Sequence, residues 1–130
     1  MPSASDNIVS GIIEKWSVAF SRLDAGALAS LYSKEAFFFG SNPRLYRGRE
    51  GVMAYFNALP RWRSPTVQFS DRVTAPVGTD AINFAGTASF DADDGALKLS
   101  VKISWVIVRE DGGWKIASHH VSSRLPLLQQ

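Results

Sequence analysis

The 130-residue sequence contains no cysteine, which excludes disulfide bonds, thiolate catalysis and metal sites with cysteine ligands. It has only two histidines, and a single inward imidazole without further ligands cannot hold a metal ion, so we predict no metal. Phosphate-binding glycine loops, serine elbows and His-Glu-x-x-His patterns are also missing. We therefore predict no cofactor, and no motif identifies a reaction.

Long hydrophobic runs are missing as well. No apolar segment approaches the roughly 18 residues that cross a bilayer, and residues 1–10 lack a basic start followed by an apolar core. We expect neither export nor contact with a membrane, and we take the cytoplasm as the default location.

The sequence also has little excess of charge of either sign, with 14 Lys and Arg against 12 Asp and Glu. A net charge of +2 does not argue for nucleic acid. Arg61 and Arg63 flank Trp62 as in single-strand nucleic-acid sites, but no second such motif supports that function. We expect no nucleic-acid partner, and we interpret Trp62 as a lid over a pocket or as surface cover.

The composition is globular, 45% hydrophobic and 20% charged, and the length suits one domain over residues 1–130. Apolar spacing predicts a first helix over 5–22, with Ser5 or Asp6 as its N-cap. A second helix is predicted to follow Asp24 and end near Ser33, and a third to run from Gly48 to Pro60.

Short strands are predicted over 36–39 and 44–47, before the third helix. From Thr66 onward the apolar pattern changes to a period of two. Longer strands are predicted at 67–75, 81–91, 97–109 and 114–123, separated by Gly- and Asp-rich turns. This order predicts an α+β fold in which the helices cover one face of a long curved antiparallel sheet.

Several weak motifs, taken in order, resemble a known family. They are Trp16, Ala19 and Phe20; Leu28, Leu31, Tyr32 and Ala36; Arg47, Gly48, Gly51, Tyr55 and Phe56; and Asp111–Ile116 followed by His119, His120, Ser122 and Ser123. Together they resemble the SnoaL-like, ketosteroid isomerase-like branch of the nuclear-transport-factor-like superfamily. The resemblance implies a cystatin-like cone, with three N-terminal helices on a strongly curved, mostly antiparallel sheet and an apolar pocket at its open end.

The resemblance does not extend to the isomerase machinery. A ketosteroid isomerase needs a carboxylate base, a tyrosine and a protonated aspartic acid. The base would fall at 39–42, where no residue accepts a proton usefully at neutral pH. The tyrosine would fall near Trp16, whose indole only donates. We therefore do not expect classical isomerase activity.

The two histidines are adjacent, so in a strand one points to the covered face and the other away. The superfamily register implies that Ala117, His119 and Val121 face the pocket, although a bulge would exchange His119 for His120. Two hypotheses stay open for His119. It is a core histidine bonded to a hydroxyl such as that of Ser122, or a catalytic acid/base or ligand-binding donor poised near neutral pH.

Aromatic residues are abundant, with four Trp, three Tyr and eight Phe. They suit either a packed core or an apolar ligand pocket. The candidate ligand-binding residues are Trp16, Phe20, Tyr32, Phe39, Tyr55, Trp62, Trp105 and His120, beside the candidate catalytic residue His119.

Two functions follow from these features. The first is a SnoaL-like protein that binds a small apolar or aromatic molecule, and that could be an isomerase-, cyclase- or dehydratase-like enzyme. The second is a non-catalytic dimerisation or association module with a filled aromatic core. In both we expect a homodimer formed through the exposed face of the sheet, where Val106 and Val108 interrupt polar positions. The sequence identifies neither the ligand nor a reaction.

Overall fold

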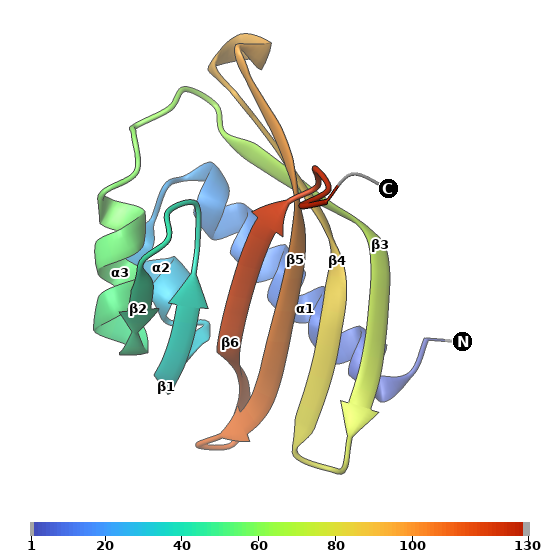
Figure 1. Ribbon diagram of the computed structural model, residues 1–130. Helices are drawn as coiled ribbons and strands as arrows, with labels where there is room; N and C mark the ends of the chain where they lie inside the picture. Colours follow the sequence, from blue (N-terminus) through green and yellow to red (C-terminus); the bar gives the residue numbers. More distant parts are fainter. Residues whose placement is uncertain (1, 129–130) are drawn as a thin grey trace.

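A single curved sheet with helices on one side makes up the protein, as seen in a computed structural model that describes residues 2–128 (Figure 1). In chain order the elements are α1 (Ala4–Ser21), α2 (Ala25–Ala29), β1 (Tyr32–Phe39), β2 (Leu45–Arg47), α3 (Gly48–Asn57), β3 (Thr66–Val77), β4 (Ala81–Ala92), η1 (Asp93–Gly95), β5 (Leu97–Glu110) and β6 (Gly113–Ser123). The predicted α+β class is confirmed by this order of elements.

The sheet has the strand order β2-β1-β6-β5-β4-β3. All neighbouring strands are antiparallel except β1 and β6, which are parallel. The strands β3 to β6 form the expected meander. Its last turn places Asp111 and Gly112 at φ 52° and 78°, the positive values that a two-residue hairpin turn requires.

Helix α1 begins earlier than its predicted caps. Ser3 is the N-cap, and its hydroxyl accepts from the Asp6 amide at 3.0 Å while the Asp6 carboxylate accepts from the Ser3 amide at 3.1 Å. The predicted caps Ser5 and Asp6 therefore lie inside the helix, because Ser3 and Asp6 form a reciprocal capping box. The buried face of α1 includes Val9, Ile12, Trp16 and Phe20.

Helix α2 is shorter than predicted, and β1 is correspondingly longer. The helix ends at Ala29, and the strand already begins at Tyr32, which pairs with Ile116 of β6. The Ile116 amide donates to the Leu31 carbonyl at 2.9 Å. Pairing with a strand distant in sequence therefore outweighs the helical spacing of Leu28, Leu31 and Tyr32.

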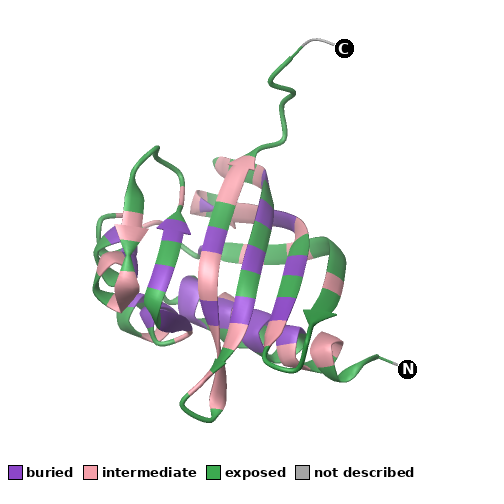
Figure 2. Ribbon diagram, turned by 60° about the horizontal axis from the view of Figure 1, so that its bottom comes forward, coloured by how far each residue is buried: buried purple, intermediate pink, exposed green. Residues whose placement is uncertain are grey.

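The core lies between the helices and the concave face of the sheet. Alternating side chains of β5 show this division, since Val101, Ile103, Trp105 and Ile107 are buried while the residues between them are exposed (Figure 2). Among the described residues, no helix combines the length and hydrophobicity that a transmembrane span requires. The inward face of β5 and β6 positions the site described next.

Candidate functional site

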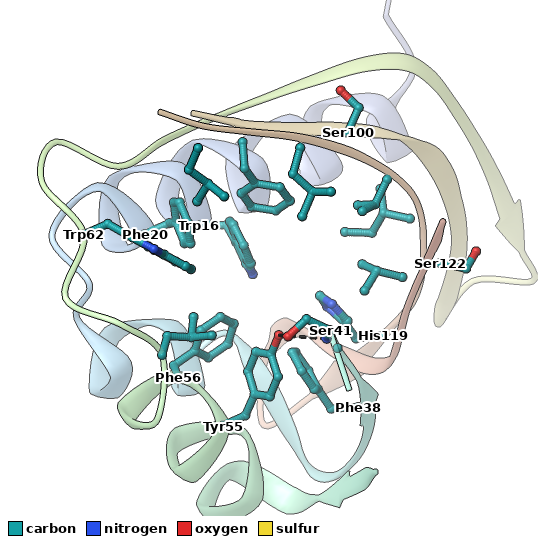
Figure 3. A pocket seen from close by; sticks show the side chains of 18 of the residues that line it. Trp16, Phe20, Phe38, Ser41, Tyr55, Phe56, Trp62, Ser100, His119 and Ser122 are labelled. Carbon is teal, nitrogen blue, oxygen red and sulfur yellow. Dashed lines mark hydrogen bonds between the residues drawn. The ribbon is translucent and has the colours of Figure 1, made fainter. Parts of the chain in front are cut away.

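A cavity of about 480 Å³ lies inside the cone, between α1, α3 and the inner faces of β1, β5 and β6 (Figure 3). Its deep walls are apolar and include Trp16, Phe38, Phe56 and Ile103, all of which are buried. The lining residues that are also solvent-exposed mark its opening. They are Ser41, Pro60, Leu99 and Ser123, from the loops after β1 and α3 and from the adjoining ends of β5 and β6.

His119 is the polar group in this apolar wall. Its side chain is 3% exposed, and its ring stacks on Phe38 with centroids 4.0 Å apart and planes 20° from parallel. Figure 3 shows the imidazole directed from β6 towards the cavity. Phe38 reaches His119 because the two residues are register partners in the parallel β1–β6 pair.

A buried hydrogen-bond network holds the imidazole from behind. The Trp105 indole donates from Nε1 to His119 Nδ1 at 3.0 Å, and the Tyr32 hydroxyl lies 2.8 Å from the same nitrogen. The Trp16 indole in turn donates to the Tyr32 hydroxyl oxygen at 3.0 Å. The predicted partner Ser122 is wrong, since the bonded hydroxyl is that of Tyr32. The Trp16 N–H is therefore engaged within the protein.

Burial determines the charge state of the site. Desolvation, with a smaller contribution from nearby His120, lowers the pKa of His119 from 6.5 to about 3. Burial also raises the pKa of Tyr32 well above its ordinary value of 10.0. Both shifts favour the uncharged side chains at physiological pH, whereas the catalytic role predicted for His119 stays a prediction.

A second polar group in the cavity wall is the pair Tyr55 and Ser41 (Figure 3). The Tyr55 hydroxyl donates to Ser41 Oγ at 2.8 Å and accepts from the Ser41 amide at 2.9 Å. Gly40 makes this arrangement possible, because a Cβ at that position would lie 2.6 Å from the Tyr55 hydroxyl oxygen. The Tyr55 ring therefore packs directly against the Gly40 backbone, and it forms part of the cavity wall.

Comparison with known proteins agrees with this geometry. The model of the SnoaL-like domain family matches residues 9–126. The chain belongs to the SnoaL-like domain family. No curated protein matches the sequence at a significant level.

Solved structures show the same fold as this SnoaL-like domain. Aln2 from a Streptomyces species has a TM-score of 0.85 at 17% identity, covering 95% of this chain and 94% of Aln2. A candidate calcium/calmodulin-dependent protein kinase II association domain from Xanthomonas campestris has a TM-score of 0.82 at 21% identity, covering 97% of this chain and 91% of that domain. A candidate NTF2-like dehydratase from Streptomyces avermitilis has a TM-score of 0.81 at 19% identity, covering 96% and 100%. At these identities the likeness establishes the fold alone, and it confirms the predicted cystatin-like, nuclear-transport-factor-like architecture.

Five of the predicted site residues line the cavity of the SnoaL-like domain. They are Trp16, Phe20, Tyr55, Trp62 and His119. Trp62 comes from the loop between α3 and β3, where its ring centroid lies 6.4 Å from that of Phe20.

Four predicted pocket residues lie elsewhere. Tyr32 and Trp105 are buried and contact His119 from behind, so they support the cavity wall without lining it. Phe39 and His120 are register partners that pack together on the opposite face of the sheet, with ring centroids 5.4 Å apart. Strand alternation explains the error, since Phe38 and His119 take the inward positions.

Strand β6 contains a β-bulge, but this bulge does not exchange the two histidines. Val106 pairs with Ser118 and Ile107 with Ile116, so Ala117 is the extra residue of β6. Because the bulge precedes the histidines, it turns Ile116 inward in place of Ala117 and leaves His119 facing the cavity.

Some lining residues were not predicted from the sequence, among them Phe38, Phe56, Ser41 and Ile103. The run Phe37–Phe39 has no polar alternation that could reveal which ring points inward. The alternation of β5 did carry the signal for Ile103, which lies on the same face as Trp105. Within residues 2–128 no cluster of His, Asp and Glu is arranged to hold a metal ion.

Proposed function

We propose that this SnoaL-like domain binds a small, apolar, ring-bearing molecule in its cavity, and that any reaction it catalyses is of the isomerase, cyclase or dehydratase type. The observation that carries the proposal is the cavity of about 480 Å³, which has apolar walls and one inward imidazole. Ligand sites are commonly apolar clefts of about 300–1,000 Å³ with a few placed polar groups.

The alternative function, an association module with a filled core, fits the interior less well. Such a module has no need for an open cavity between Trp16, Phe56 and Ile103. The likeness to a candidate NTF2-like dehydratase and to a candidate scytalone dehydratase from Novosphingobium aromaticivorans also favours a small-molecule function.

Binding and association are compatible, because they use opposite faces of the sheet. Phe37, Phe39 and Val106 leave apolar surface exposed away from the cavity. A structural neighbour is named as an association domain. We therefore retain the homodimer as part of the proposal.

The test is a calorimetric binding screen of two-ring aromatic ketones, phenols and hydrocarbons against the wild type and a cavity-filling variant. Val101 lines the cavity, and Val101→Phe should abolish binding while the protein stays folded. Lys102→Phe is the matched control, since it adds the same ring to the outer side of the same strand. Absence of binding across the screen, or unchanged binding by Val101→Phe, would overturn the proposal.

A further inference from the structure

We infer that the cavity selects uncharged ring compounds that carry a carbonyl acceptor, because His119 is locked as a hydrogen-bond donor and cannot serve as a base. This inference rests on the proposed function, since it names the class of molecule that the same site accepts. It depends on which nitrogen of the imidazole carries the proton.

Trp105 determines whether His119 Nδ1 carries a proton. An indole nitrogen has one hydrogen and no acceptor lone pair. Its position 3.0 Å from His119 Nδ1 therefore requires that Nδ1 accept through its lone pair. A proton on Nδ1 would set two N–H donors against each other and leave the buried Trp105 N–H without a partner.

The Tyr32 hydroxyl reinforces this arrangement. Its oxygen accepts the N–H of Trp16, and its own proton has His119 Nδ1 at 2.8 Å as an acceptor. Trp105 of β5 and Tyr32 of β1 thus both direct a proton towards Nδ1, and Trp16 of α1 holds the Tyr32 hydroxyl in place. All three side chains are at most 2% exposed, so water does not compete for these bonds.

The remaining ring nitrogen, Nε2, then carries the proton of the neutral imidazole. In the described part of the chain, every fully enclosed side-chain nitrogen or oxygen has a hydrogen-bond partner. His119 bonds to the protein through Nδ1, and its ring lines the cavity, so the Nε2–H is presented to the cavity. A ligand must offer an acceptor at that point.

The surroundings exclude charge on the ligand. None of the described residues that line the cavity is Asp, Glu, Lys or Arg. The titratable groups facing the imidazole from the packed elements are Tyr32 of β1 and Tyr55 of α3, while His120 points to the other face of the sheet. A carboxylate or ammonium group would therefore lose its hydration without gaining a counter-ion.

The first experiment reads the tautomer directly. Long-range proton–nitrogen NMR spectra of uniformly labelled protein should show one bare and one protonated nitrogen in the His119 ring. The pattern should not change between pH 5.5 and pH 8. The variant His120→Gln assigns the signals. A protonated Nδ1, or titration of the His119 ring within this interval, would overturn the inference.

The second experiment measures binding of four probes of nearly equal shape: 2-acetylnaphthalene, 2-ethylnaphthalene, 2-naphthoate and 2-naphthylmethylammonium. The ketone should bind about tenfold more tightly than the hydrocarbon, as expected for one hydrogen bond in an apolar site. Both ions should bind more weakly than the hydrocarbon. Equal binding of ketone and hydrocarbon, or preferred binding of an ion, would overturn the selection.

His119→Asn is the matched variant, because the Asn Oδ1 is as many bonds from the backbone as Nδ1 and can still accept from Trp105 and Tyr32. The Asn side chain has no atom at the position that Nε2 occupies in His119. The ketone should lose its tenfold advantage in this variant while the hydrocarbon binds as before. If no probe binds the wild type, the proposed function fails, and the NMR spectra still decide the tautomer.

Discussion

The interior has a packed half and a hollow half, although aromatic residues dominate both. In the packed half, under β3 and β4, Phe69 and Phe84 lie 5.5 and 5.1 Å from Trp105 between ring centroids, and Trp16 lies 5.8 Å from Phe69. In the hollow half, under β5, β6 and β1, Phe38 and Phe56 face open space. Aromatic content therefore does not distinguish a core from a pocket. The position of the covering helices does, since α1 lies over the packed half and α3 stands at the other side of the cavity (Figures 1 and 3).

The largest difference between the halves should appear on truncation of a packed ring. Phe84→Ala should lower the free energy of unfolding by about 3–5 kcal/mol, because it opens a new cavity among close-packed rings. Val101→Ala, at the existing cavity, should cost only about 1 kcal/mol. Urea denaturation measures both values. Similar losses would show that the two halves are equally packed.

The second effect is a dependence of stability on pH, and it arises from His119 at the boundary between the two halves. Burial lowers the pKa of His119 from 6.5 to about 3 in the folded protein, so between these pH values the unfolded chain binds a proton at His119 and the folded protein does not. Its contribution to stability is complete above pH 6.5 and is lost as the pH falls from 6.5 towards 3. At pH 5 the loss should be on the order of 2 kcal/mol relative to pH 7.

The pH effect can be separated from that of the carboxylates. Hydrogen bonds hold the pKa values of Asp6 and Glu110 below 3.8 and 4.5, so these groups weaken the fold only below those values. Thermal melts between pH 5 and 7 should therefore show a slope in the wild type that disappears in His119→Asn. A slope that survives the substitution would show that a group other than His119 causes the pH dependence.

A smaller effect is expected from closing the hollow half. Gly40→Ala should displace the Tyr55 ring and break its bonds to Ser41, at a cost of roughly 1–2 kcal/mol and with loss of ligand binding. Gly11→Ala is the control, because nothing lies within 4 Å of a Cβ there and the residue is inside α1. It should gain about 0.5–1 kcal/mol. Equal melting temperatures for the two variants would contradict the close contact at Gly40.

The smallest effect on folding is predicted for the outer face, which belongs to neither half. Val106→Lys should change the free energy of unfolding by no more than about 0.5 kcal/mol, because the side chain is exposed. It should nevertheless halve the mass in sedimentation, from twice the chain mass to one chain. A wild type that sediments as a monomer at micromolar concentration would contradict the proposed homodimer.

Most elements could be predicted from the sequence, because their signals are local. Helical spacing located α1 and α3 within a few residues, and the alternation of β5 identified its buried face. The boundary between α2 and β1 could not be predicted, since Tyr32 suits both elements and its strand partner Ile116 lies more than eighty residues away. The parallel pairing of β1 with β6 is equally a product of the tertiary fold.

The two histidines mark the limit of the sequence most clearly. Their adjacency in a strand determined that one would point inward and one outward, because side chains alternate. The tertiary structure decided which one, through a bulge at Ala117 and the register that sets His119 against Phe38. It also decided the chemistry, because Trp16, Tyr32 and Trp105 come from three separate elements and meet only when the sheet curves around α1. Spacing along the chain specifies which way a side chain points, whereas a buried hydrogen-bond network depends on distances that exist only once those elements are packed.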